Sequence, residues 1–345
     1  MIQIPLPISP LQVRRRAIGA TDRSIKDAMR DAPSSLTART VAVTGAGGFL
    51  GAAVARQLAA AGATVHAFGR HPPDAGSGAT AHAWDPTRDA GPPAPGLAVD
   101  AVIDCAALLP SLEGDGDTLK RVNRQLAEGA LDLAARTGGR VVYMSSQSVY
   151  GRPDVAEIDA DTPPAPNTAY GEAKLAGERL LAGAVAAGRI RGAVALRLPA
   201  VVGPGAHDNF PATVAGRLLR RETVTLFNPD GLYNAVVGAA SVAAFAGRLA
   251  SAVTGFHAVS LASAPAIPLR AAAEAIAAGL DRPLVAEVRA APHASPTIDP
   301  SAAEALGFET ERPEAVLQAF GKACRPGSGH DADAASDIAT PPLTR

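Results

Sequence analysis

Three things are scarce in this sequence of 345 residues: cysteine, net charge and long apolar runs. The two cysteines, Cys105 and Cys324, cannot form a disulfide framework, so we expect a reducing, cytoplasmic location. A net charge of −1 gives no electrostatic reason to expect nucleic acid or an anionic membrane as a partner. No uninterrupted apolar run reaches the roughly 18 to 20 residues that a membrane-spanning helix needs. The length and the hydrophobic content of 47% suit one large domain or two.

The two ends of the chain differ from its middle in composition. Residues 1–38 carry Pro, Arg, Ser and Asp with little periodicity, and residues 325–345 are rich in Pro, Gly, Asp, Ser and Thr. Neither end has the apolar content to offset the entropy of ordering. We therefore expect a mobile leader over 1–38 and a disordered tail over 325–345.

Between the ends, strand-like and helix-like segments alternate. Short apolar runs that suit strands buried on both faces lie at residues 41–43, 64–68, 81–84, 101–105, 141–144 and 193–197. Helical patterns fall between several of them, notably at 122–136 and 170–187. This alternation predicts an α/β fold, a Rossmann-like doubly wound parallel sheet, whose ligands bind at the carboxyl ends of the strands.

A glycine-rich turn follows the first apolar run. Residues 44–51 read Thr-Gly-Ala-Gly-Gly-Phe-Leu-Gly and lead into a helical pattern over 52–61. A turn of this kind between strand and helix lets the backbone approach a pyrophosphate, whose charge then meets free N–H groups at the helix N-terminus. The turn predicts a dinucleotide cofactor held by Gly45, Gly48, Phe49, Leu50 and Gly51.

A second set of residues has side chains that can move or hold a proton. Tyr170 and Lys174 are four residues apart on a predicted helix, which puts both side chains on one face. The pKa of tyrosine is about 10, too high for a base at neutral pH, and a neighbouring ammonium lowers it. Ser146 ends a predicted strand at the same edge as the glycine turn, where its hydroxyl would hold a substrate oxygen while Tyr170 moves the proton. Taken alone, the tyrosine and lysine also fit a plain surface pair.

Together these motifs resemble the extended short-chain dehydrogenases/reductases, and within them the NAD(P)-dependent epimerase/dehydratase family. The resemblance rests on the glycines of residues 45–51, the run Tyr-Met-Ser-Ser-Gln-Ser-Val-Tyr-Gly over 143–151, and Tyr170-Gly171-x-x-Lys174. It spans about residues 41–320, in the order and spacing of the family. It implies a Rossmann domain over 39–205 and a smaller, mainly substrate-binding lobe over 206–324, some segments of which return to the main sheet.

The resemblance also assigns roles to single residues. Ser146, Tyr170 and Lys174 match the family's catalytic set, and Tyr170 and Lys174 also lie against the nicotinamide end of the cofactor. Further cofactor contacts are implied at Asp85, Ala106, Ala107 and Asn123. No metal is implied, and a homodimer formed through residues 120–136 and 170–187 is expected.

One departure from the family concerns the cofactor. Many members that prefer NAD carry an acidic residue at the end of the second strand, where this chain has Gly69 followed by Arg70. A carboxylate would repel a 2′-phosphate, whereas an arginine beside a glycine can bind one. The sequence therefore favours NADP(H) slightly over NAD(H), with Arg70 as the contact. Otherwise Arg70 merely begins the following loop.

Other departures concern the substrate. The 4,6-dehydratases of the family place an Asp-Glu pair after the catalytic Ser or Thr, where this chain has Gln147 and Ser148, so dehydration by that route is disfavoured. Asn234 takes the place of an arginine that can hold a nucleotide diphosphate in the family, which argues against a nucleotide-sugar substrate. The candidate substrate contacts are Gln147, His207, Asn209 and Asn234.

These observations predict an NAD(P)-dependent oxidoreductase that transfers hydride at a secondary alcohol or ketone of a small substrate, with sugar-like compounds among the candidates. Two alternatives stay open. The first is a sugar-nucleotide epimerase that oxidises and re-reduces its substrate with one bound cofactor. The second is a non-catalytic NAD(P)-binding regulator, against which the presence of Ser146, Tyr170 and Lys174 argues.

Overall fold

The computed structural model describes residues 39–70, 78–89, 91, 96–291 and 295–326. The expected leader over 1–38, and residues 327–345 of the expected tail, lie outside the described residues. Arg325 falls within the expected tail but is anchored, because its Nε donates a hydrogen bond to the Gly279 carbonyl at 2.7 Å. The described part of the chain thus continues past the predicted boundary at residue 325.

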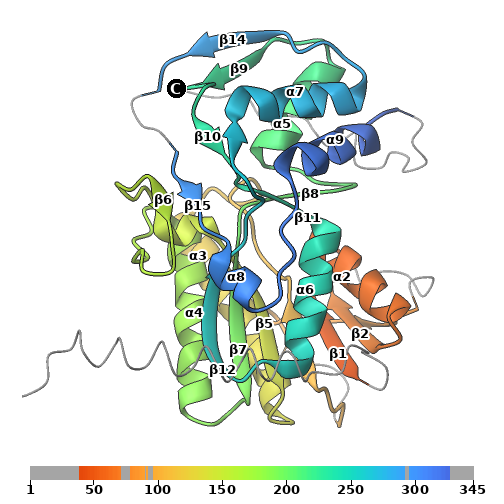
Figure 1. Cartoon of the computed structure of the whole chain (residues 1–345). Coiled ribbons are helices and arrows are strands. Elements are labelled where there is room, and N and C mark those ends of the chain that lie inside the picture. The colour runs from red at the N-terminus through yellow and green to blue at the C-terminus, as the bar shows by residue number, and fades with distance from the viewer. Residues whose placement is uncertain (1–38, 71–77, 90, 92–95, 292–294, 327–345) are drawn as a thin grey trace, which may run out of the picture.

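A seven-stranded parallel sheet forms the lower half of the molecule in Figure 1. Its strands, in spatial order, are β12 (Gly255–Ser260), β7 (Gly192–Leu198), β5 (Arg140–Ser146), β4 (Ala101–Asp104), β1 (Thr40–Thr44), β2 (Thr64–Gly69) and β3 (Thr80–Ala83). The chain order reverses between β1 and β4, which opens a crevice at the carboxyl ends of these two strands. The predicted doubly wound α/β fold is confirmed.

Helices cover both faces of the sheet (Figure 1): α2 (Phe49–Ala60) and α6 (Ala239–Ala252) one face, α3 (Gly116–Ala135) and α4 (Ala169–Ala186) the other. The side chains of β1 show why both faces are apolar. Val41 and Val43 are buried in the core beneath α2 and α6, whereas Ala42 belongs to the core beneath α3 and α4. Alternation along a strand sends successive side chains to opposite faces, so a continuous apolar run fills both cores.

The helices α3 and α4 begin where polar side chains cap them. Helix α3 starts at Gly116, earlier than the expected residue 122, because the Asp115 side chain accepts a hydrogen bond from the Thr118 N–H. Helix α4 starts at Ala169, where the Thr168 hydroxyl accepts from the Gly171 N–H. The two helices lie side by side in Figure 1. The pairing of two copies through them stays a prediction.

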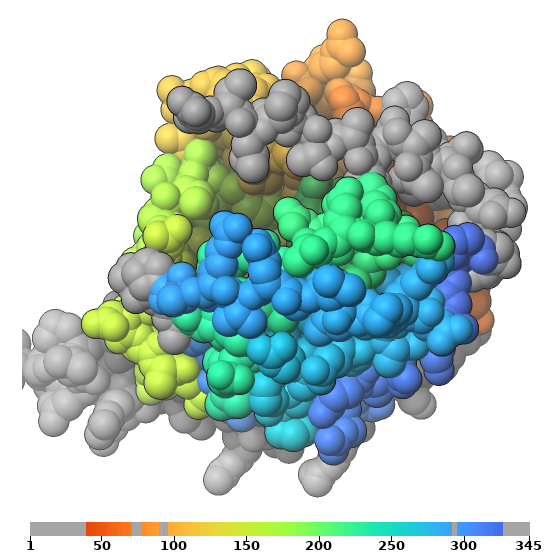
Figure 2. All heavy atoms as spheres, turned by 90° about the horizontal axis from the view of Figure 1, so that it is seen from above, coloured from red at the N-terminus to blue at the C-terminus, as the bar shows by residue number. Residues whose placement is uncertain are grey.

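A smaller lobe sits above the sheet in Figure 1. It contains the helices α5 (Phe210–Leu219), α7 (Leu269–Leu280) and α9 (Pro313–Ala323), the parallel pair β9 (Val224–Phe227) and β14 (Ala286–Arg289), and the antiparallel pair β10 (Leu232–Tyr233) and β13 (Ile267–Pro268). They share one apolar core. From above, the green and blue spheres of the lobe fill the centre of the view, and the orange and yellow spheres of the sheet half show along one side (Figure 2).

Short pairings tie the lobe to the sheet half. Residues 206–324 supply β12 and α6 to the main sheet and its cover, as well as the lobe itself. Further links are the parallel pairs of β8 (Ala200–Val202) with β11 (Val236–Gly238) and of β6 (Glu157–Ile158) with β15 (Thr297–Ile298), the latter followed by the short helix α8 (Ser301–Ala305). The lobe therefore lies next to the carboxyl ends of the strands of the main sheet.

Some features are absent from the part of the chain that the structure describes. No helix there is long and apolar enough to cross a membrane. Within the same residues, no three His, Cys, Asp or Glu side chains gather where they could hold a metal ion.

Candidate active site

The glycine turn lies at the crevice between β1 and β4. Gly45 has a φ of +63°, and a Cβ added to it would stand 2.7 Å from the backbone nitrogen of Ala106. A Cβ on Gly51 would collide with the carbonyl oxygen of Gly45. Gly48 caps α2 without any side chain, so the N–H groups of the first turn keep no side-chain partner. Glycine is therefore required by the packing at Gly45 and Gly51, and the turn presents bare backbone to the crevice.

A cleft of about 330 Å³ opens beside this turn. Six of the expected cofactor residues line it: Gly45, Gly48, Arg70, Asp85, Ala106 and Ala107. The sequence did not indicate most of its apolar walls, which come from Phe68, Trp84, Leu108, Leu112, Val122 and Leu126. For Val122 and Leu126, the one signal was their place at the start of the helix predicted over 122–136. The three other expected contacts in the turn and its helix, Phe49, Leu50 and Gly51, do not line this cleft.

The polar end of the cleft carries Arg70 and Asp85. The Asp85 carboxylate accepts hydrogen bonds from the Thr87 N–H at 3.0 Å and the Thr87 hydroxyl at 2.7 Å. Burial alone would raise the pKa of Asp85, but these hydrogen bonds and the charges of Arg70 and Arg88 lower it. The indole N–H of the neighbouring Trp84 is buried and has no partner among the described residues. This end of the cleft therefore combines hydrogen-bond donors, from Arg70 and Trp84, with the negative charge of Asp85.

Asn123 is buried beside the cleft and holds its wall. Its Nδ2 donates to the carbonyls of Leu108 and Leu119, and its Oδ1 accepts from the Leu108 N–H, all at 2.9–3.0 Å. These bonds fix the segment that follows Ala106 and Ala107. They favour a structural role for Asn123 through that segment, and direct contact with a cofactor stays a prediction.

Lys174 and Tyr170 project from the first turns of α4, as the spacing predicts. Lys174 is buried, with 2% of its surface exposed. Its Nζ donates to the Met144 carbonyl at 2.7 Å and lies 5.7 Å from the centre of the Tyr170 ring and 4.7 Å from that of Tyr143. Burial would lower the pKa of Lys174, but the neighbouring Tyr143, Tyr170 and Asp104 raise it. The lysine is thus held as an ammonium beside the Tyr170 ring.

Ser146 ends β5 and comes close to the start of α4 through the backbone. A Cβ on Gly171 would collide with the Ser148 carbonyl, so only glycine lets α4 approach the chain that follows Ser146. The Ser146 hydroxyl accepts from the Ser148 N–H at 3.2 Å and the Ser148 hydroxyl at 2.8 Å. Its own proton is therefore available for another acceptor.

Gln147 begins the 3-10 turn η2 (Gln147–Tyr150) after this strand. Its Nε2 donates to the Arg197 carbonyl at 2.9 Å, and its Oε1 is buried without a partner in the described chain. The side chain is thus held against β7, and contact with a substrate stays a prediction.

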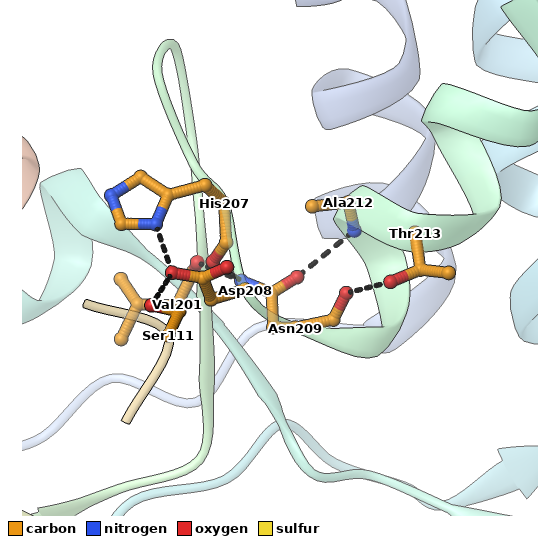
Figure 3. Close-up of polar contacts among 7 residues, drawn as sticks. All are labelled: Ser111, Val201, His207, Asp208, Asn209, Ala212 and Thr213. Atoms are coloured by element: carbon orange, nitrogen blue, oxygen red, sulfur yellow. Dashed lines mark hydrogen bonds and ion pairs between the residues drawn. The ribbon is translucent and has the colours of Figure 1, made fainter. Parts of the chain in front are cut away.

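The expected lobe residues His207 and Asn209 lie in the loop before α5 (Figure 3). His207 Nδ1 and the Ser111 hydroxyl both meet the Asp208 carboxylate, at 2.9 and 2.6 Å, so the loop is tied to the segment between the cleft residues Leu108 and Leu112. Asn209 caps α5, because its Oδ1 accepts from the Ala212 N–H while its Nδ2 donates to the carbonyls of Val201 and His207. These contacts favour a capping role for Asn209; substrate contacts by either residue stay predictions.

Asn234 is buried away from the cleft, between the lobe and the sheet half. Its Nδ2 donates to the Ile298 carbonyl at 2.7 Å, and its Oδ1 accepts from the Ile298 N–H at 3.0 Å. Both polar atoms of the side chain are therefore engaged with the backbone of β15. This contact favours a structural role, and a substrate contact at Asn234 stays a prediction.

Residues 41–231 match the model of the NAD dependent epimerase/dehydratase family. The chain belongs to that family. The match contains the glycine turn, the residues that line the cleft, and Ser146, Tyr170 and Lys174.

Relatives within and around this family are distant. A dTDP-6-deoxy-L-talose 4-dehydrogenase (NAD(P)(+)) of Kitasatospora kifunensis is 33% identical over 183 residues, which are 50% of this chain and 56% of that protein. The chain thus spans about half the length of this curated relative. Among solved structures, MoeE5 in complex with UDP-glucose and NAD is 25% identical with a TM-score of 0.67, covering 82% of this chain and 98% of that one. The UDP-N-acetylglucosamine 4-epimerase of Methanobrevibacter ruminantium M1 is 16% identical with a TM-score of 0.70, covering 83% and 98%.

Proposed function

We propose that this protein is an NAD(P)-dependent oxidoreductase that transfers hydride at a secondary alcohol or ketone of a small, sugar-like substrate. The observation that carries the proposal is Lys174, a buried lysine held beside the ring of Tyr170 at the edge of the sheet where the cleft opens. A lysine is rarely buried unless it is paired or used.

The residues of the cleft fit a dinucleotide. The backbone at Gly45 leaves no room for a side chain, and the uncapped start of α2 offers N–H groups to a pyrophosphate. The remaining length of the cleft is walled by apolar side chains, with Asp85 and Arg70 at its polar end. A nicotinamide cofactor bound here would supply or accept the hydride.

The protein's own side chains then handle the proton. Tyr170 gives a proton to the substrate oxygen during reduction and takes it back during oxidation. The ammonium of Lys174 stabilises the phenolate that Tyr170 becomes when its proton leaves. Ser146, whose hydroxyl proton is available, donates a hydrogen bond to the same substrate oxygen and orients it.

A preference for NADP(H) rests on the end of β2. A Cβ at Gly69 would meet the nitrogens of Ala46 and Gly47 at 3.8 Å, which is ordinary contact, so packing does not require glycine there. The fold therefore leaves room for a side chain at this place, which supports attributing the absence of an acid to the ligand. Arg70 lines the cleft next to it, where a guanidinium can bind a 2′-phosphate.

The substrate class is proposed from the relatives. The Kitasatospora relative is named as a dehydrogenase of a deoxy-sugar nucleotide. In this chain Asn234 stands where the resemblance places a diphosphate-binding arginine, and its side chain is engaged with Ile298. We therefore propose a sugar-like ring as the reacting part and treat the nucleotide as a variable to be tested.

The test is a panel of keto-sugars and sugar alcohols, free and nucleotide-linked, assayed with NADPH and NADH at 340 nm. We expect net cofactor turnover with at least one carbonyl–alcohol pair, faster with the phosphorylated cofactor. An epimerase is the second candidate, favoured by the fold shared with a UDP-N-acetylglucosamine 4-epimerase. It would convert a sugar into its epimer without net change at 340 nm. Tight NADPH binding with no turnover of any substrate would contradict both and support a regulator.

A further inference from the structure

Asp104, the last residue of β4, is a buried acid to which the reaction above gives no role. It is 1% exposed and lies between Thr44 on β1 and Tyr143 on β5 in the register of the sheet. Its Oδ1 accepts from the Thr44 hydroxyl at 2.5 Å and from the Ala106 N–H at 3.2 Å. Its Oδ2 is buried and has no partner among the described residues.

Leaving a carboxylate oxygen buried and unpaired is costly, so a nearby positive charge is needed to offset it. Lys174 supplies that charge. Its ammonium lies over the ring of Tyr143, and Tyr143 is the residue of β5 that pairs with Asp104 of β4. The groups that face Lys174 from the packed elements are Asp104 and Cys105 from β4 and the segment after it, Tyr143 from β5, and Tyr170 from α4 itself. Asp104 is the one acid among them.

We propose that Asp104 is a positioning residue that holds Lys174 charged and in place and, through Thr44 and Ala106, fixes the cleft wall against the glycine turn. The inference rests on the proposed function, because Lys174 acts on Tyr170 there. The two hydrogen bonds to Oδ1 join the residue before Gly45 to the Ala-Ala segment. One side chain thus links the cofactor-binding backbone to the lysine of the reacting set.

Asp104 and Lys174 each favour the charged form of the other. Complete burial raises the pKa of Asp104, and the Lys174 charge and the hydrogen bonds from Thr44 and Ala106 offset only part of that rise. In turn, Asp104 is one of the groups that raise the pKa of Lys174. Removing either partner therefore leaves the other as an uncompensated charge in the interior.

A double-mutant cycle in thermal stability tests this coupling without substrate or cofactor. We expect Asp104→Asn to lower the melting temperature more in the wild-type background than in Lys174→Met, where no ammonium is left unpaired. The matched control is Asp100→Asn. Asp100 lies just before the same strand, and its carboxylate accepts from the Thr40 N–H. The loss from Asp100→Asn should be the same in the wild type and in Lys174→Met. Equal losses from Asp104→Asn in both backgrounds would overturn the proposal.

A second measurement covers the case in which Asp104→Asn does not fold. In Lys174→Met the lone Asp104 should take up a proton at a higher pH than in the wild type. The difference in melting temperature between this variant and the wild type should therefore shrink as the pH falls. A pH-independent difference would count against the pairing. Because both measurements omit turnover, they stand even where the Tyr170 assignment fails. Where turnover is found, Asp104→Asn should lower kcat with little change in the KM for NADPH, and an unchanged kcat would remove the positioning role.

Discussion

Two buried clusters of charge lie one turn apart on α4 and differ in how completely they are paired. The first, the Glu178 network, consists of Glu178 with Ser145, Tyr150, Arg197 and Ser260. Arg197 donates to both carboxylate oxygens of Glu178, at 3.1 and 2.7 Å, and to the Tyr150 hydroxyl at 2.8 Å. Ser145 donates to Glu178 at 2.6 Å, and Ser260 meets Tyr150 at 3.0 Å. Every charged atom of the Glu178 carboxylate is therefore used.

The second cluster is that of Lys174 and Asp104. It has a carboxylate oxygen without a partner among the described residues, and its ammonium faces two aromatic rings and one carbonyl. A fully paired cluster ties α4 to β5 and β7 and stabilises the fold. An incompletely paired one, joined through Thr44 to the lining of the cleft, leaves a buried charge of the kind that candidate sites carry. The contrast teaches that pairing, rather than burial or charge, separates the structural cluster from the candidate site.

The largest expected effect is on turnover and comes from Tyr170, whose ring faces Lys174 of the second cluster. Tyr170→Phe removes the group that moves the proton, so kcat should fall by about 10²- to 10⁴-fold. The melting temperature and NADPH affinity should stay near those of the wild type, because the ring and Lys174 remain. Steady-state kinetics and NADPH fluorescence titration measure the two quantities. Turnover close to the wild-type rate would refute the role of Tyr170.

The next effect is on stability and comes from the Glu178 network. Glu178→Gln leaves Arg197 without its counter-charge in the interior, which should lower the free energy of unfolding by about 3–5 kcal/mol. The matched control is Glu172→Gln on the same helix, whose exposed pair with Lys120 at 3.3 Å should matter little. Urea unfolding compares them. Equal losses in the two variants would mean that the Glu178 network is not the stabilising cluster.

A smaller effect concerns cofactor binding and comes from Arg70, at the polar end of the cleft. Arg70→Ala should weaken NADPH binding by about tenfold or more, since a hydrogen bond to a charged group is lost, and leave NADH binding unchanged. Arg124→Ala, which removes an exposed arginine paired with Glu128 on α3, serves as control. If both cofactors lose affinity equally, Arg70 contributes to the cleft but does not select the phosphate.

The smallest effect comes from a pair of neutral groups outside both clusters. His66 Nδ1 and His82 Nε2 are 2.8 Å apart, and burial lowers the pKa of both, with His82 also lowering that of His66. The unfolded chain takes up protons at higher pH than the folded one, so stability is complete above about pH 6.5 and is lost as the pH falls. Thermal melting between pH 7 and pH 5 should show a smaller loss in His82→Leu than in the wild type. The same loss in both would exclude the pair as its source.

Much of the fold follows from local pattern. The strands appear at the predicted apolar runs because each must fill two cores, one on each side of the sheet. The start of α3 was misplaced because the capping bond of Asp115 depends on a polar residue that the apolar periodicity does not weigh. The residues of the candidate site were harder to predict from the sequence. Gly45, Tyr170 and Lys174 have steric or electrostatic requirements that spacing expresses, whereas Trp84 and Phe68 reach the cleft only because β2 and β3 end beside it.

The sequence by itself determined the features that depend on local chemistry. These are glycine where a turn must approach another strand, apolar runs for a sheet covered on both faces, and a tyrosine and a lysine one helical turn apart. The tertiary structure decided which polar side chains are already occupied. Asn209 and Asn234, expected near substrate, have their amides engaged with backbone, whereas Asp104 keeps a buried oxygen unpaired beside Lys174. The reason is physical: a residue's chemistry is local, but the partners that satisfy it arrive from strands and helices far along the chain.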